Sequence, residues 1–246
     1  MADAVRVDSD SAVVSYRPAA GEERSALATD ASPRALTDAV PWRTFRWYFG
    51  QRHYSGTYWA ATERDHVIYE SRLELANLLL ADFDQTIHRI VAQPFSLRAV
   101  VNGQMSRHVP DFLCDTDGGL VVVDVVRSER MAHPRIVLLL AWTKSIVESL
   151  GWTYLVVNEP PKIRLANVRF LSGYRREWLV NQDVLGEMCS CIGQFAGMSI
   201  ADAERSVKGY PRPLIRPALM HLLWRHAYLV NLDESLDPSM VLERGR

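Results

Sequence analysis

The stretch Gly118-Gly119-Leu120-Val121-Val122-Val123-Asp124-Val125-Val126 decides the fold. A continuous run of valines that follows two glycines is typical of a strand buried on both faces, in the centre of a sheet covered by helices. One ionisable residue, Asp124, interrupts the run. A carboxylate at such a position costs free energy unless it binds a cation or a hydrogen-bond partner. The run therefore predicts an α/β core, with a candidate site at Asp124.

The residues around this strand predict the rest of the core. Before it, we expect a hairpin over 42–59, a helix from Ser71 to Asp82, and strands over 87–93, 95–101 and 111–114. After it, the apolar pattern of 136–150 predicts a helix that Gly151 ends, and 152–157 predicts a further strand. This order of elements indicates a mixed sheet flanked by helices.

The two ends of the chain differ from this core. Beyond Ile163 we expect helices over 181–195, 200–208 and 213–224, then two short strands over 227–232 and 238–242, an order typical of a winged helix. Residues 1 to about 40 show no sustained periodicity, which predicts a loosely ordered, flexible arm. The predicted division is an arm over 1–40, an α/β domain over 41–165 and a winged-helix-like domain over 166–246.

The composition is that of an ordinary globular protein, with 48% hydrophobic and 23% charged residues among 246. The net charge of −1 provides no general attraction to nucleic acid or to an anionic membrane, so any basic site must be local. We expect no membrane span, because no segment approaches about 18 uncharged apolar residues, and no secretory leader. An odd number of cysteines, three, indicates a reduced, cytoplasmic protein.

Three carboxylates are placed to share one site. Asp111 and Asp124 lie on neighbouring predicted strands, and the third carboxylate is either Glu70 or Glu74 of the preceding helix. An oxygen-rich pocket of this kind suits Mg²⁺ or Mn²⁺, which activates water and neutralises charge on a phosphate. Two structural alternatives are equally open: Ser71 and Glu74 have the spacing of a capping box, and Asp111 fits a turn or the start of a strand.

Four short motifs, taken in order, resemble the TnsA-type endonuclease subunit of heteromeric transposases. They are Ser71-Arg72-Leu73-Glu74-Leu75, Gln93-Pro94-Phe95, Pro110-Asp111-Phe112-Leu113 and Val122-Val123-Asp124-Val125, within a likeness that covers about 42–176 and is closest to actinobacterial versions. The resemblance implies a restriction-endonuclease-like core with a PD-(D/E)xK site and a winged-helix-like region that contacts an AAA+ transposition ATPase. It also implies that this subunit cuts the 5′ strand of double-stranded DNA at transposon ends, while a DDE transposase subunit cuts and joins the 3′ strand.

On the matching positions, the resemblance assigns the metal ligands to Glu74, Asp111 and Asp124, and places Glu70 beside them. The lysine of the motif falls on Val126, which has no charge. A lysine there positions the attacking water and offsets the charge of the transition state, so its loss should lower the rate.

Arg127 is the candidate for a relocated catalytic cation. Strand alternation points it to the opposite face, and a bulge at Val125-Val126 would turn it into the site. Arg107 and His108, beside the Pro-Asp motif, are other possible substitutes. Three states of the site therefore stay open: active with a relocated cation, active but slow, or degenerate and kept as a scaffold.

A local excess of positive charge follows the strand of Asp124. Residues 127–176 contain nine Lys or Arg against three Glu, a net charge of +6. The excess favours contact with a phosphate backbone, although a solvated face is the ordinary reading of a charged cluster. The residues expected to contact DNA are Arg107, His108, Arg130, Arg135 and Lys144.

Two other functions stay open. A stand-alone repair or defence nuclease would have the same core and would cut without partner proteins. A catalytically degenerate subunit would serve as a DNA-binding and assembly scaffold, and Val126 is the feature that motivates this alternative.

Overall fold

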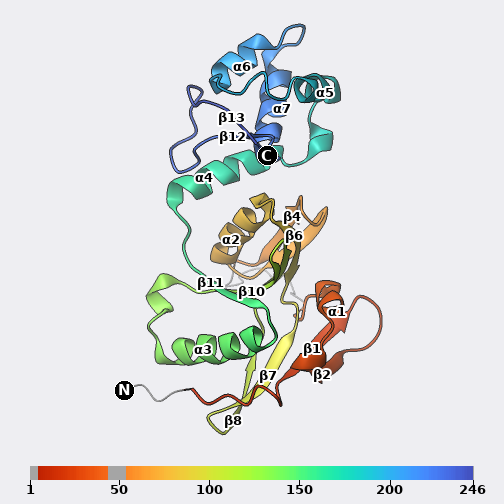
Figure 1. Ribbon diagram of the computed structural model, residues 1–246, viewed down its shortest axis with the longest axis vertical. Coiled ribbons are helices and arrows are strands. Elements are labelled where there is room, and N and C mark those ends of the chain that lie inside the picture. Colours follow the sequence, from red (N-terminus) through yellow and green to blue (C-terminus); the bar gives the residue numbers. More distant parts are fainter. Residues whose placement is uncertain (1–4, 44–53, 246) are drawn as a thin grey trace. The chain divides into compact units, whose positions relative to one another are not determined.

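A computed structural model describes residues 5–43 and 54–245 (Figure 1). The chain divides into two compact units. The first comprises Met1–Ala81 and Thr86–Glu159, and the second comprises Asp82–Gln85 and Pro160–Arg246. The sequence places the boundary slightly later, between residues 165 and 166.

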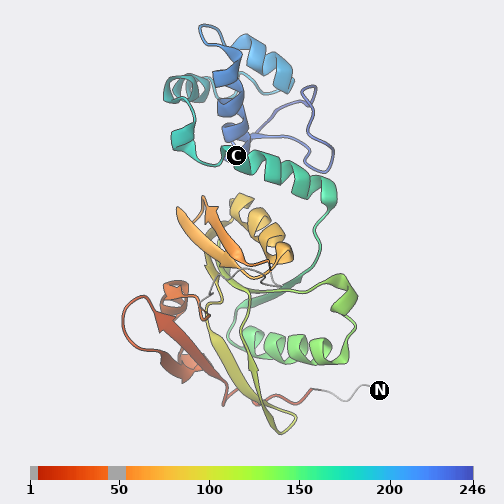
Figure 2. The same cartoon turned by 180° about the vertical axis from the view of Figure 1, so that it is seen from behind.

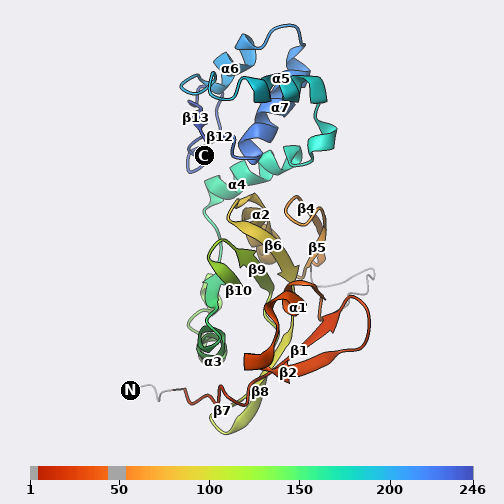
Figure 3. The ribbon, with the colours of Figure 1, turned by 45° about the vertical axis from the view of Figure 1, so that its right-hand side comes forward.

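The core of the first unit is a four-stranded mixed sheet in the order β11-β10-β9-β6. The strands β6 (Ile87–Ala92), β9 (Phe112–Thr116) and β10 (Gly119–Val125) are antiparallel neighbours, labelled side by side in Figure 3. The fourth strand, β11 (Thr153–Val157), runs parallel to β10. The valine run forms β10, and helices pack on the sheet, which confirms the predicted α/β core.

Alternation along β10 gives this sheet two different faces. Val121, Val123 and Val125 pack in one apolar cluster with leucines of α2 (Arg72–Phe83). Leu120 and Val122 pack in the other cluster, with residues of α3 (Pro134–Ser149). Asp124 lies between Val123 and Val125 in the strand, so its side chain points to the opposite face, the one covered by α3.

A second sheet packs in the same cluster as α3. Its order is β2-β1-β7-β8, and β3 pairs with β1. The elements are β1 (Val13–Pro18), β2 (Arg24–Leu27), η1 (Ala28–Asp30), α1 (Pro33–Thr37), β3 (Ala39–Val40), β7 (Ser96–Val101) and β8 (Gln104–His108). The sequence did not predict β8.

The structure corrects the predicted loosely ordered arm. Residues 13–40 form the first elements of the second sheet, and the side chains of Ala12 and Val14 are fully buried. Figure 2 shows the red N-terminal strands beside the yellow strand β7. In the pairing of β1 with β7, Val13 lies opposite Arg98. The prediction failed because these strands are short and their partner lies far along the chain, so no local periodicity records the pairing.

A hairpin that packs with α2 and the central sheet is formed by β4 (Gly56–Ala60) and β5 (Asp65–Tyr69). The first strand of the hairpin expected over 42–59 falls mostly on 44–53, outside the described residues.

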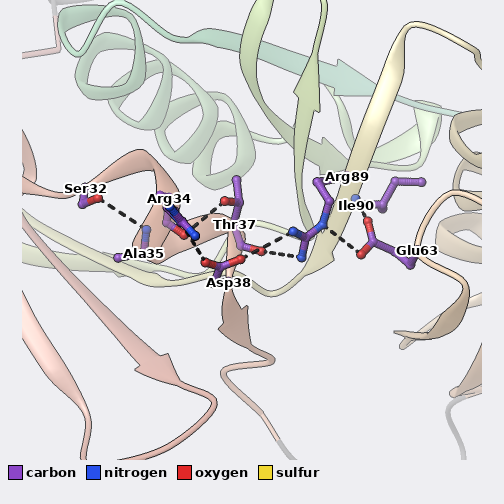
Figure 4. Close-up of polar contacts among 8 residues, drawn as sticks. All are labelled: Ser32, Arg34, Ala35, Thr37, Asp38, Glu63, Arg89 and Ile90. Carbon is purple, nitrogen blue, oxygen red and sulfur yellow. Dashed lines mark hydrogen bonds and ion pairs between the residues drawn. The ribbon is translucent and has the colours of Figure 1, made fainter.

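A polar network ties the turn of this hairpin to β6 and to α1 (Figure 4). Glu63 accepts a hydrogen bond from the backbone N–H of Ile90, and one from Nε of Arg89 at 3.1 Å. The same guanidinium donates to the backbone oxygen of Thr37 at 3.1 Å and lies 3.4 Å from Oδ1 of Asp38. The network holds the edge of the central sheet to the N-terminal segment.

The second unit is mainly helical. It contains α4 (Lys162–Leu171), η3 (Ser172–Tyr174), η4 (Glu177–Leu179), α5 (Gln182–Ser190), α6 (Ile200–Ser206), α7 (Arg212–Trp224), β12 (Tyr228–Leu229) and β13 (Glu243–Arg244). The helix α7 contributes eight buried side chains, among them Leu219 and Trp224. The expected helices and closing strand pair are present, with the last strand slightly beyond 238–242. Of the helices within 5–43 and 54–245, none is both long and apolar enough to cross a membrane.

Candidate active site

Asp111 lies where the chain enters β9, at the end of the central sheet. Its backbone N–H donates to the carbonyl of Val123 at 3.1 Å, and its Oδ2 accepts from the N–H of Val125 at 2.7 Å. Burial raises the pKa of Asp111 well above its usual value, and the negative charges of Asp124 and Glu74 raise it further. The structure thus places Asp124 and Glu74 close enough to Asp111 for their charges to act on its carboxyl, a setting that favours a cation.

Glu74 lies in the first turn of α2 and has a structural role as well. The backbone N–H of Glu74 donates to Oγ of Ser71 at 3.1 Å, which is one half of a capping box. The other half is altered, because Oε2 of Glu74 accepts from the N–H of Glu70 at 2.7 Å. Burial raises the pKa of the Glu74 carboxyl. The cap and the acidic site therefore use the same side chain.

Asp124 is bound on the α3 face by two side chains. Nε2 of His108 lies 2.9 Å from Oδ1 and 2.8 Å from Oδ2, and the Tyr154 hydroxyl donates to Oδ2. Burial and the charge of Asp124 raise the pKa of Tyr154, so the phenol keeps the proton that it donates. The His108 ring lies edge-on to Trp142 of α3, with centroids 6.3 Å apart. These bonds satisfy both oxygens of a carboxylate that is 2% exposed.

Gln93 joins the parts of the site and was not singled out by the sequence as a site residue. Its backbone N–H donates to the carbonyl of Asp111 at 2.8 Å, and its carbonyl accepts from the N–H of Trp42 at 2.9 Å. Its side chain donates to Glu70 at 2.7 Å and accepts from the N–H of Arg43 at 3.1 Å. Gln93 is buried and has a φ of 47°, a conformation that non-glycine residues adopt where surrounding contacts hold them.

The cation bound to this acidic network is Arg43. Its Nη1 lies 3.2 and 3.3 Å from the two oxygens of Glu70. Arg127, in contrast, is exposed and pairs with Glu129 at 3.9 Å. The pairing of β10 with β11 runs through Val125 without a register shift, so the bulge that would turn Arg127 inward is not present. The sequence does not predict the ion pair of Arg43 with Glu70, because the two residues lie 27 positions apart.

The residues expected to contact DNA separate into two sets. Arg107 and His108 line a cleft beside the carboxylates, and Nε of Arg107 donates to Oγ of Ser96 at 2.8 Å. The other three are exposed, on or next to η2 (Ser128–Arg130) and α3: Arg130, Arg135 and Lys144. Lys144 lies 3.7 Å from Glu148 on the next turn of its helix.

Whether this site can hold a metal ion depends on which carboxylate oxygens accept no hydrogen bond from the protein. Within the described chain, Oδ1 of Asp111 accepts no hydrogen bond, whereas both oxygens of Asp124 do. Accordingly, no group of three or more His, Cys, Asp or Glu side chains in 5–43 and 54–245 is arranged to hold a metal ion. Mg²⁺ usually binds one or two carboxylates and completes its shell with water and substrate phosphates. Asp111 and Glu74 fit that requirement.

No protein-family model matches the chain, and a search of curated proteins finds no match.

Proposed function

We propose that this protein is a metal-dependent DNA endonuclease subunit that cuts the 5′ strand at transposon ends within a heteromeric transposase. The observation that carries the proposal is the position of the Asp111 carboxylate, hydrogen-bonded at the paired ends of β9 and β10, where the charges of Asp124 and Glu74 act on it. The order of the four motifs supports it. In this proposal the first unit is a restriction-endonuclease-like core, and the second is a winged-helix-like domain that contacts an AAA+ ATPase.

In the proposed reaction, water attacks a phosphodiester of double-stranded DNA. Glu74, Asp111 and Asp124 would hold Mg²⁺ or Mn²⁺, which supplies an activated water and neutralises charge on the phosphate. Asp111 offers an open oxygen, while Asp124 must exchange a bond to His108 or Tyr154 before it can bind an ion. Gln93 keeps Glu70 and the main chain of Asp111 in place.

The proposed setting is a cytoplasmic complex with the DDE transposase and the ATPase. All three cysteines are thiols, which supports a reducing compartment. Specificity for the transposon ends would come from the partner transposase, which leaves this subunit to contact the DNA backbone.

A second candidate is a degenerate nuclease fold that serves as a DNA-binding and assembly scaffold. It is favoured by Val126 in place of the lysine of the motif and by the two hydrogen-bonded oxygens of Asp124. Under this alternative, Asp111→Ala should leave partner binding and transposition intact. Loss of transposition in a normally folded variant would exclude it.

The first experiment is Mn²⁺ titration by calorimetry in the presence of a short DNA duplex, because phosphate oxygens complete the coordination shell. We expect saturable binding to the wild type and its loss in Asp111→Asn. Asp115→Asn is the matched control, since it makes the same change on the same strand. An absence of binding to the wild type would favour the scaffold. Binding that persists in Asp111→Asn would reject the assigned ligand.

If the ion binds, cleavage of an end-labelled duplex is then measured with and without the partner proteins. Cleavage of the 5′ strand that requires them supports the proposal. Cleavage by the protein alone would instead indicate a stand-alone nuclease.

A further inference from the structure

A cleft of about 580 Å³ lies beside the carboxylates of the first unit. It is lined by Arg17, Trp42, Arg43, Arg107, His108 and Val109. The guanidinium carbons of Arg17 and Arg107 lie over the ring of Trp42, 5.2 and 5.5 Å from its centroid. Trp42 is only 8% exposed and its backbone N–H donates to the carbonyl of Gln93, so it provides a fixed surface for both guanidiniums.

Two of the three arginines of this cleft have no carboxylate partner in the part of the chain that the structure describes. Arg43 has a carboxylate partner, Glu70. For Arg17 and Arg107, no ion pair with a carboxylate is formed within residues 5–43 and 54–245. Guanidiniums that converge on one cleft repel one another unless an anion enters. Their planar donor groups match the oxygens of a phosphate.

Two contacts connect the cleft to the candidate active site. His108 lines the cleft and binds Asp124 through Nε2. Arg43 lines it as well and binds Glu70, whose backbone N–H donates to Glu74. A phosphate in the cleft would therefore be a close neighbour of one held at the carboxylates.

We propose that this cleft binds the phosphodiester backbone of the DNA strand that is cut, with Arg17 and Arg107 as the phosphate-binding residues and Trp42 as the residue that positions them. The inference rests on the proposed nuclease function, because it names the substrate contact of the same centre. It also gives the N-terminal sheet a role in binding DNA, since Arg17 lies at the end of β1.

The test is fluorescence anisotropy with a labelled DNA duplex in EDTA, so that neither metal binding nor cleavage contributes. Arg17→Gln and Arg107→Gln are each expected to weaken binding by about tenfold. Each should also lower the slope of log affinity against log salt by about one. The control is Arg24→Gln, an exposed arginine on β2 of the same sheet, which should bind DNA as the wild type does.

Arg17→Lys and Arg107→Lys keep the proposal testable if a glutamine variant fails to fold. Lysine retains the charge and loses the planar donor group, so an intermediate affinity with an unchanged salt slope is expected. Wild-type affinity and salt slope in all four cleft variants would overturn the proposal. So would calorimetry in which Arg17→Gln loses binding of inorganic phosphate while its affinity for DNA is unchanged, because the cleft would then be a site for a free anion.

The failure of this inference is distinguishable from that of the proposed function. If the wild type binds DNA through the cleft but takes up no Mn²⁺, the cleft stands and the nuclease proposal fails. If the protein cuts DNA while the cleft variants bind and cut normally, the nuclease proposal stands and the cleft is rejected.

Discussion

Asp124 and His108 are joined through a single ring nitrogen, which lies 2.9 and 2.8 Å from the two oxygens of the carboxylate. The Tyr154 hydroxyl adds a third bond to the same group. Asp124 thus interrupts an apolar strand without an unsatisfied charge, because donors from β8 and β11 reach it on the α3 face. The same bonds compete with any metal ion for its oxygens.

Tyr154→Phe tests this competition. The change removes the donor to Oδ2 of Asp124 and leaves His108 in place. We expect a loss of about 1–2 kcal/mol in the free energy of unfolding, measured in urea. We also expect tighter Mn²⁺ binding in calorimetry, because Oδ2 of Asp124 then has only its bond to His108 to exchange for the ion. Tyr16→Phe in β1 is the control and should change neither value. Weaker Mn²⁺ binding in Tyr154→Phe would contradict the assignment of Asp124 as a ligand.

The stability of the metal-free protein should depend on the ionisation of Asp111. Its pKa is raised in the folded state, so the folded protein keeps a proton that the unfolded chain releases near pH 3.9. The free energy of unfolding therefore falls as pH rises above about 3.9, by about 1.4 kcal/mol per unit, until the folded pKa is reached.

Asp111→Asn should remove this dependence, because the amide has no charge and its oxygen still accepts from Val125. Urea unfolding in EDTA at several pH values is the measurement. The variant should be more stable than the wild type at neutral pH and similar to it at low pH. An Asp111→Asn protein that is less stable than the wild type at neutral pH would show that the charged form is favoured after all.

Two substitutions of Glu74 should separate its two roles. Glu74→Gln keeps an oxygen that can accept from the N–H of Glu70, whereas Glu74→Ala loses it. The alanine variant should be less stable than the glutamine variant by about 1 kcal/mol. Both should lose Mn²⁺ affinity to a similar extent. If the glutamine variant binds Mn²⁺ as the wild type does, Glu74 is only a cap.

At position 93, a glycine variant should be more stable than an alanine variant, which is the opposite of the usual order of stability. Both changes remove the side-chain bonds to Glu70 and Arg43, but only alanine keeps a Cβ at a φ of 47°. Gln93→Gly should therefore be more stable than Gln93→Ala by about 1 kcal/mol. Urea unfolding of the two variants measures the difference. The opposite order would mean that the backbone at this position relaxes when its side-chain bonds are lost.

The sequence by itself determined the elements whose signals are local. The valine run predicts β10, the leucine spacing after Ser71 predicts α2, and the apolar pattern of 136–150 predicts α3, because burial repeats with the period of each element. The same patterns place Asp111 and Asp124 on neighbouring strands, which the pairing of β9 with β10 confirms.

Only the tertiary structure decided the contacts between distant segments. The N-terminal strands gain their order by pairing with β7, Gln93 links Arg43 to Asp111, and Trp42 lies under arginines from β1 and β8. None of these contacts leaves a periodic trace, because each depends on how the chain returns to the sheet rather than on neighbouring residues. The sequence did not predict the hydrogen-bond partners of Asp124 for the same reason. A strand pattern predicts the face on which a side chain lies, but only the fold determines which residues contact it there.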